Sequence, residues 1–296
     1  MNDTFSGAGV ALVTPFNENL DVDYAGLKAL LEHTAKGSDY WVVHGTTGES
    51  ATTTSEEKAK ILDFVKQNNK ANLPIVVGVG GNNTDEVVKK FKAIDWDGVD
   101  GVLSVCPYYN KPSQKGIYEH FIRVADASKR PVIIYNVPGR TGCNIAAETT
   151  LALAEHKNIA GVKESSCNLE QVAMIAKYKP DRFNLISGDD MFTLPIMALG
   201  GEGAISVLAN ALPEIFGGMV KSMLRGEYET ARKHMFRLLE LHSLMYVDGS
   251  PSGIKQVLEL LNICKNYVRL PLVPVSEKLK NQIAEKLKYA EPYLQV

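Results

Sequence analysis

The chain has 296 residues, of which 45% are hydrophobic, and its formal net charge is -2 at pH 7. A chain of this length can bury a large core, and it suits either one closed α/β barrel or two smaller domains. Charges of both signs are interspersed, which argues against a nucleic acid or a membrane surface as the main partner. We therefore expect the partner to be a small molecule.

The cysteines and the N-terminus indicate where the protein works. Cys106, Cys143, Cys167 and Cys264 form no C-x-x-C pair and have no histidine at the spacing of metal ligands. The first residues lack the basic and apolar regions of a signal peptide, and no apolar run approaches the ~18 residues that span a membrane. We expect reduced thiols in a cytoplasmic protein.

Short apolar runs alternate with helical patterns in the first part of the chain. Strands are expected at 9–14, 40–44, 74–79, 101–105, 131–136, 159–163, 183–187 and 203–206. The early helices are expected at 23–36, at 55–69 after a Thr54/Glu57 capping box, and at 85–94 after a Thr84 cap. Continuous apolar strands are typical of a parallel sheet covered on both faces, so eight such units predict a (β/α)8 TIM barrel.

The pattern changes near residue 227. Helices are expected at 228–246, 253–262 and 276–289, and no ninth strand follows. We therefore predict a catalytic barrel over residues 1–226 and a C-terminal helical bundle over residues 227–296. Because no flexible linker marks the boundary, the bundle is expected to pack on the barrel.

The stretch from Ile159 to Ser166 is an apolar run that ends abruptly at Lys163. An amine at the end of a buried strand is costly to keep charged, so burial should lower its pKa and leave part of it as a neutral nucleophile. Lys163 is therefore a candidate Schiff-base lysine. The alternative is a solvated lysine at a strand end, which is the commoner environment for this residue type.

In a TIM barrel the carboxyl ends of the strands and the loops after them form the active site. Polar residues at those positions are Thr14, the loop 45–49, 107–110, Tyr135, Asn136, Lys163, 188–190 and Ser206. Neighbouring strands lie about 4.8 Å apart, so Tyr135 and Lys163 are expected to face the same pocket. This clustering favours a catalytic role for the lysine.

Two features suit the binding of carboxylates. The loop from Gly45 to Gly48 offers close backbone approach, two hydroxyls and free N–H groups, although a plain turn is the alternative. Arg140 follows Tyr135 by five residues and could grip a second carboxylate bidentately. Its alternative is an exposed loop arginine without a specific partner.

Other patterns do not point to a nucleotide or a metal. The glycines at 78–81 lack the spacing of a nucleotide-binding loop. Asp189 and Asp190 fit the N-cap of a helix beginning near Met191 better than a magnesium site. His44, at a strand end, is expected to be packed or hydrogen-bonded. We infer no metal.

Motifs at 45–50, 107–110, 135–142, 161–164 and 187–190 occur in this order along the chain. Together they resemble those of the dihydrodipicolinate synthases, pyruvate-dependent class I aldolases related to N-acetylneuraminate lyase, and the resemblance extends from about Gly9 to the C-terminal helices. It implies a lyase that condenses pyruvate with aspartate 4-semialdehyde to 4-hydroxy-tetrahydrodipicolinate, on the route to lysine and diaminopimelate.

The resemblance also implies roles for individual residues. Lys163 would form a covalent imine with pyruvate, without another cofactor, and Tyr135 would relay protons together with Thr46 and Tyr109. The residue matching Tyr109 reaches into the neighbouring subunit in this family, which implies a tight dimer, usually paired into a homotetramer. Substrate would be bound by Thr47, Arg140 and the backbone at Gly188 and Ile205.

Arg140 helps to choose among related activities. Relatives that act on sialic acid or sugar acids generally lack this arginine, whereas the synthases use it for the carboxylate of the semialdehyde. A short dianionic product needs a second cationic anchor, while a sugar acid needs groups that bind hydroxyls. The alternatives are a sister aldolase acting on another 2-keto acid and a barrel that only binds.

In lysine-inhibited relatives the effector lies at the dimer interface. The matching positions are Ser50, Ala51, Ser55, Lys58, Asn82, Glu86 and Tyr108. Those relatives often have histidines at the positions of Ser55 and Lys58. A cationic Lys58 near the ammonium group of lysine would oppose its binding, so we predict weak or absent feedback by lysine.

Overall fold

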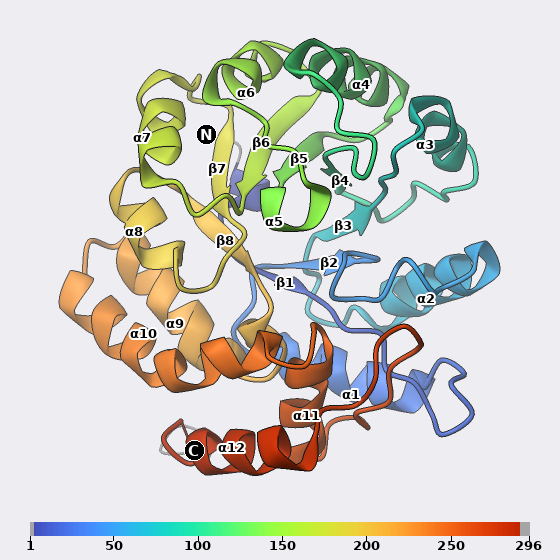
Figure 1. Ribbon diagram of the computed structural model, residues 1–296, viewed down its shortest axis with the longest axis vertical. Helices are drawn as coiled ribbons and strands as arrows, with labels where there is room; N and C mark the ends of the chain where they lie inside the picture. Colours follow the sequence, from blue (N-terminus) through green and yellow to red (C-terminus); the bar gives the residue numbers. More distant parts are fainter. Residues whose placement is uncertain (1–2, 291–296) are drawn as a thin grey trace. The chain divides into compact units, whose positions relative to one another are not determined.

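The structure of the protein is a computed structural model, of which residues 3–290 are described (Figure 1). Eight strands follow one another in chain order around a closed barrel. They are β1 Gly7–Ala11, β2 Tyr40–Val43, β3 Ile75–Gly78, β4 Gly101–Val105, β5 Val132–Asn136, β6 Ile159–Glu164, β7 Asn184–Ser187 and β8 Gly203–Ser206. The predicted (β/α)8 barrel with C-terminal helices is confirmed. None of the helices within residues 3–290 is long and apolar enough to cross a membrane.

The chain divides into two compact units. The first comprises the described residues up to Gly7 together with Pro74–Ile205, and the second comprises Ala8–Leu73 together with the described residues from Ser206 onward. The first unit therefore contains β3 to β7, and the second contains β2 and the C-terminal helices.

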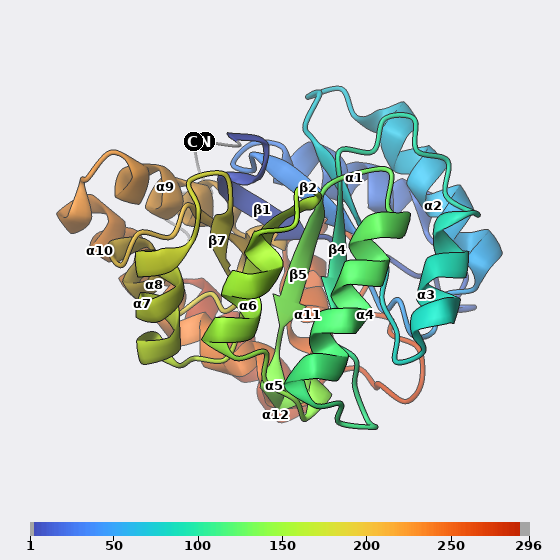
Figure 2. The ribbon, with the colours of Figure 1, turned by 90° about the horizontal axis from the view of Figure 1, so that it is seen from above.

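Helices surround the strands of the first unit. They are α3 Thr84–Phe91, α4 Gln114–Ala127, α5 Pro138–Thr141, α6 Ala147–Ala154, α7 Leu169–Tyr178 and α8 Thr193–Ala198. Neighbouring helices α3, α4, α6 and α7 pack in this order outside the strands, and Figure 2 shows α4 and α6 alongside β5. Every residue of β5 and β6 is buried, because helices cover one face of these strands and the other faces the barrel interior.

Two predicted helix starts in this unit are wrong by a short distance. The cap of α3 is Asn83, whose side chain accepts hydrogen bonds from the N–H groups of Asp85 and Glu86. Thr84 is the first helical residue instead, and its hydroxyl contacts a ring nitrogen of His120 at 2.9 Å. Asp189 accepts from the N–H groups of Met191 and Phe192, as a capping residue does, but in a turn that precedes α8.

The helices of the second unit are α1 Tyr24–Thr34, α2 Ser55–Asn68, α9 Pro213–Leu224, α10 Tyr228–His242, α11 Ser252–Leu260 and α12 Glu277–Leu287. The predicted capping box of Thr54 and Glu57 at the start of α2 is confirmed. The predicted helix 228–246 ends at His242 and continues as a 3-10 turn. Helix α9 packs on α10, and α11 packs on α12 (Figure 1).

The first strand is shorter than predicted, although the chain beyond it stays buried. β1 ends at Ala11. Beyond it, side chains supply hydrogen bonds to the backbone in place of a neighbouring strand. The amide oxygen of Asn210 accepts from Val13 N at 3.0 Å and its nitrogen donates to Ala11 O at 2.8 Å. The Thr14 hydroxyl donates to Gly48 O at 2.7 Å. Polar backbone groups of a buried segment need partners, and these side chains supply them where regular pairing stops.

Candidate active site

Lys163 and Tyr135 lie against each other near the carboxyl ends of two adjacent strands. They are partners in the parallel register of β5 and β6. The Lys163 Nζ lies 4.4 Å from the centroid of the Tyr135 ring. Lys163 is only 5% exposed and Tyr135 only 7%. The two side chains therefore lie close together, as a shared pocket would require, and the alternative of a solvated lysine is wrong.

The surroundings of Lys163 change its chemistry. Burial, the dominant cause, lowers the pKa of Lys163 to about 8, against the attraction of Asp190 and with a smaller contribution from Arg140. With that pKa, about one amine in ten is neutral at pH 7, compared with fewer than about one in a thousand for an ordinary lysine. The site therefore holds a nucleophilic amine at neutral pH.

The Tyr135 phenol has the opposite tendency. Burial raises the pKa of Tyr135 above its ordinary value, while Arg140 and the hydroxyl of Ser165 oppose that rise. The phenol therefore remains protonated at neutral pH and is available as a hydrogen-bond or proton donor. An amine that is partly neutral and a phenol that is fully protonated suit a site that forms a bond at nitrogen and moves protons nearby.

Gly188 and Ser165 complete the wall around the lysine. A Cβ atom at Gly188 would lie 2.0 Å from Ser165 Oγ and 2.8 Å from Lys163 Cε, so only glycine leaves room for both side chains. The Ser165 hydroxyl is buried, and it is close enough to the Tyr135 phenol to favour the ionised form of that phenol. Ser165 was not predicted as a site residue. Its position two residues after Lys163 could have indicated it, because residues two apart on a strand point to the same face.

A buried carboxylate lies on the other face of β6. Glu164 is 1% exposed, and neutral donors surround it. Asn136 Nδ2 donates to its two oxygens at 3.1 and 3.0 Å, Gln171 Nε2 donates at 2.9 Å, and the Ser166 N–H donates at 2.6 Å. Because Asn136 and Glu164 are register partners, this network ties the ends of β5 and β6 together just where Tyr135 and Lys163 lie. Sequence reasoning placed no role on Glu164.

Arg140 lies in the short helix α5, which follows β5 directly. The helix closes at Gly142, whose φ of 71° is the left-handed conformation that glycine adopts most readily. Arg140 is exposed, and its positive charge acts on both Lys163 and Tyr135. The arginine is thus near the pair while its guanidinium stays open to solvent.

The loop Gly45–Glu49 belongs to the second unit. Its backbone forms two successive turns, with the Gly48 N–H donating to Gly45 O at 3.1 Å and the Glu49 N–H to Thr46 O at 3.0 Å. Thr46 is exposed and Thr47 is buried. The turn interpretation therefore describes the backbone correctly, and carboxylate binding by this loop stays a prediction. Ile205, on β8 of the first unit, is buried.

His44 behaves as predicted. It is buried, and its Nε2 lies 3.0 Å from Lys58 O. Burial lowers the pKa of His44 to about 4, so the ring is neutral under ordinary conditions. Within residues 3–290 no three His, Cys, Asp or Glu side chains are grouped as a metal site would require.

The residues predicted for an effector are divided between the units. In the first unit, Asn82 Nδ2 donates to Tyr108 O at 3.2 Å, and Glu86 pairs with Lys89 at 2.7 Å. In the second unit, Lys58 Nζ donates to Thr53 O at 2.8 Å. The neighbouring predicted residues there are Ser50, Ala51 and Ser55.

A closed eight-stranded barrel with a lysine–tyrosine pair at its strand ends defines the class of this protein as a TIM-barrel enzyme. The chain belongs to the dihydrodipicolinate synthetase family, whose model matches residues 4–290.

Relatives and solved structures agree with this assignment. The chain is 49% identical over 284 residues to a 4-hydroxy-tetrahydrodipicolinate synthase of Parabacteroides distasonis, covering 95% of this chain and 96% of the relative. It is 47% identical over 283 residues to the enzyme of the same name from Cytophaga hutchinsonii, covering 95% of both chains. The crystal structure of dihydrodipicolinate synthase from Aquifex aeolicus is similar with a TM-score of 0.92 and 39% identity, over 97% of this chain and 98% of that one.

The close contact at Gly188 generates a test of the site. We predict that Gly188→Ala lowers kcat/KM by roughly 100-fold, because the new methyl group displaces the Lys163 side chain and small misplacements of reacting groups are costly. The cost in stability should stay within about 1–3 kcal/mol, as for a small-to-large change in a packed core. Steady-state kinetics and denaturant unfolding measure both quantities.

Gly139→Ala is the matched control, because a Cβ at Gly139 would meet no atom within 4 Å. It should retain the wild-type rate. Equal activity of the two alanine variants would show that Gly188 does not shape the space around Lys163.

Proposed function

We propose that this chain acts as a 4-hydroxy-tetrahydrodipicolinate synthase, a lyase that condenses pyruvate with L-aspartate 4-semialdehyde on the route to lysine and diaminopimelate. Similarity to relatives of that name over 95% of the chain supports the proposal. The observation that carries it is the buried Lys163 amine, with its pKa lowered to about 8, beside the Tyr135 ring.

The first step is the formation of an imine. The neutral amine of Lys163 attacks the carbonyl carbon of pyruvate, and the carbonyl oxygen leaves as water once it has been protonated. The protonated C=N bond then withdraws electrons, so that the pyruvate methyl group loses a proton and becomes an enamine. The proposed reaction proceeds through this covalent imine and uses no separate cofactor.

The second step forms the carbon–carbon bond. The enamine carbon attacks the aldehyde carbon of the semialdehyde, whose oxygen takes a proton, and the protonated C=N bond to Lys163 forms again. Attack of an amine or of water on that carbon then releases the product and restores the free Lys163 amine. Tyr135 is suited to pass these protons, because its phenol remains protonated where it contacts the lysine. Thr46 and Tyr109 are proposed to continue the relay to solvent.

A loop rich in hydrogen-bond donors and one arginine are proposed to bind the carboxylates of the two substrates. Thr47 and the N–H groups of its loop are assigned to the carboxylate of pyruvate, with the backbone at Gly188 and Ile205 bordering the bound molecule. Arg140 is assigned to the carboxylate of the semialdehyde, which its exposed guanidinium can meet bidentately.

Tyr109 supports an assembly of several chains. Its side chain is 87% exposed, and its φ of 75° places it in a left-handed backbone conformation that is uncommon for a large residue. A strained, exposed aromatic side chain is suited to be covered by another subunit. We propose that it reaches the site of a second chain in a tight dimer, two of which form a homotetramer in the cytoplasm.

Two further proposals concern organisation and regulation. Residues 1–226 are proposed to form the catalytic barrel, and residues 227–296 a helical bundle added to it; residues 1–2 and 291–296 of these ranges lie outside the described residues. Feedback by lysine is proposed to be weak or absent because of the positive charge of Lys58. Inhibition by micromolar lysine in the steady-state assay would contradict this second proposal.

Reduction with borohydride tests the proposed chemistry directly. In the presence of pyruvate, the protein should gain one reduced pyruvyl adduct, and peptide mass analysis should locate it at Lys163. Lys163→Ala should form no adduct while keeping its fold, as circular dichroism would show. An adduct at another lysine, or none at all in the wild type, would refute the imine mechanism.

The choice of the second substrate is tested at Arg140. Arg140→Ala should raise the KM for aspartate 4-semialdehyde by about 10- to 100-fold, because a charge-assisted hydrogen bond contributes roughly 1.5–3 kcal/mol, while the KM for pyruvate should change little. Arg123→Ala, which removes an exposed arginine paired with Asp85 at 3.4 Å, is the control. Equal effects on both substrates would argue against the assignment of Arg140.

A further inference from the structure

The second unit contains a buried ion pair that the proposed reaction does not use. Glu49 is the last residue of the loop Gly45–Glu49, called here the threonine loop after Thr46 and Thr47. It is joined to Lys255 of α11 with an Nζ–Oε1 distance of 2.5 Å. The two side chains are 1% and 0% exposed. Removing charges from water costs free energy that can exceed the attraction between them. The complete burial of this pair therefore needs a further explanation.

The carboxylate of Glu49 is held by a second contact from the same C-terminal segment. Its other oxygen accepts from the Arg269 N–H at 2.9 Å, and Lys255 Nζ also donates to Tyr267 O at 2.7 Å. The ring of Phe16 lies beneath both cations, 4.2 Å from Lys255 Nζ and 4.3 Å from Arg269 Cζ. Residues more than 200 positions away along the chain thus fix the side chain of Glu49.

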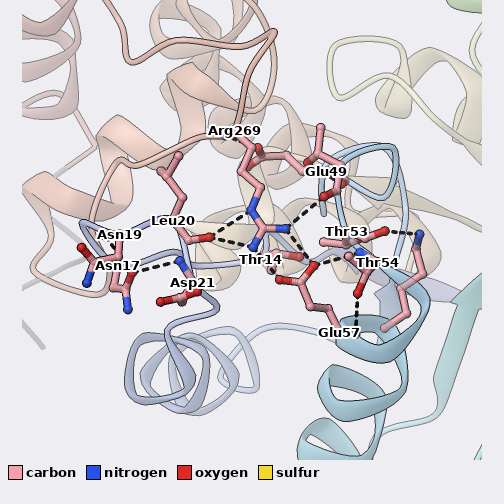
Figure 3. A network of polar contacts seen from close by, with 12 residues as sticks. Thr14, Asn17, Asn19, Leu20, Asp21, Glu49, Thr53, Thr54, Glu57 and Arg269 are labelled. Atoms are coloured by element: carbon pink, nitrogen blue, oxygen red, sulfur yellow. Dashed lines mark hydrogen bonds and ion pairs between the residues drawn. The ribbon is translucent and has the colours of Figure 1, made fainter.

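Arg269 also connects the threonine loop to neighbouring segments of the second unit (Figure 3). Its guanidinium binds both carboxylate oxygens of Glu57 at 2.8 and 2.5 Å, and it donates to Thr52 O at 3.0 Å and to Leu20 O. Thr52 in turn bonds to Glu49 through its backbone at 3.0 Å. The arginine therefore ties the end of the threonine loop to the start of α2.

The backbone of Glu49 links this anchor to the threonines. Its N–H donates to Thr46 O at 3.0 Å, and its φ is 53°, a left-handed conformation that non-glycine residues seldom adopt. Such conformations persist when surrounding contacts determine them and are frequent near functional sites. The side chain of Glu49 is held by the C-terminal segment, and its backbone holds Thr46.

We propose that Glu49 and Lys255 are positioning residues for the threonine loop, so that the C-terminal helices form part of the machinery that binds pyruvate. This inference rests on the proposed function, because it assumes that Thr47 binds the pyruvate carboxylate and that Thr46 relays protons. The pair acts through the loop and touches no substrate itself.

The test compares three variants in the full-length protein. Lys255→Met leaves the Glu49 carboxylate buried without its cation, so Tm should fall by roughly 10 °C, and kcat/KM for pyruvate should fall by roughly 100-fold. The double variant Glu49→Gln/Lys255→Met contains no unpaired charge. It should recover most of the lost Tm and little of the lost kcat/KM, with a raised KM for pyruvate and an almost unchanged KM for the semialdehyde.

Lys179→Met is the control, because Lys179 forms an ion pair with Glu202, just before β8, whose side chains are less deeply buried, at 10% and 18% exposed. It should lower Tm and leave the KM for pyruvate unchanged. Recovery of both Tm and kcat/KM in the double variant would show that the pair only stabilises the fold and would overturn the inference.

Borohydride trapping separates this inference from the proposed function. If the wild type traps pyruvate at Lys163 and the double variant needs a higher pyruvate concentration for the same yield, both proposals hold. If the wild type traps pyruvate and the double variant traps it equally well, the positioning role fails alone. If the wild type traps none, the proposed function fails, whatever the variants do.

Discussion

The exclusion of water from one amine is the constraint on which the rest of the structure depends. Lys163 is at the end of a strand that is buried along its whole length, and this burial lowers the pKa of its amine. Asp189 and Asp190 oppose the shift, so the charged form is not excluded altogether. A pKa of about 8 keeps both forms of the amine populated, which suits the proposed attack on a carbonyl and the protonated imine that would follow.

Other parts of the first unit maintain that environment. Glu164 and Asn136 join the ends of β5 and β6 behind the reactive pair, and Gly188 leaves the space that the lysine side chain occupies. In the second unit, α11 and the segment after it hold the end of the threonine loop. The C-terminal segment thus contributes buried charges to the end of this loop, which is why we propose that it takes part in positioning the loop.

The sequence predicted those features that depend on local pattern. Strand periodicity and strand order were enough to place Tyr135 beside Lys163, because adjacent parallel strands keep a fixed spacing. The cap of α3 was placed one residue late, since Asn83 and Thr84 are both suitable capping residues and only the backbone decides between them. The contact of Glu49 with Lys255 could not be predicted, because it joins residues far apart along the chain and nothing in either local sequence specifies its partner.

The most direct measurement is an NMR titration of the Lys163 side chain in protein labelled with 13C-lysine, with its signal assigned by comparison with Lys163→Arg. The Cε resonance should shift with a midpoint near the lowered value of about 8. A midpoint at the ordinary lysine value of 10.5 would show an amine in contact with water, and would contradict the view that burial prepares it for reaction.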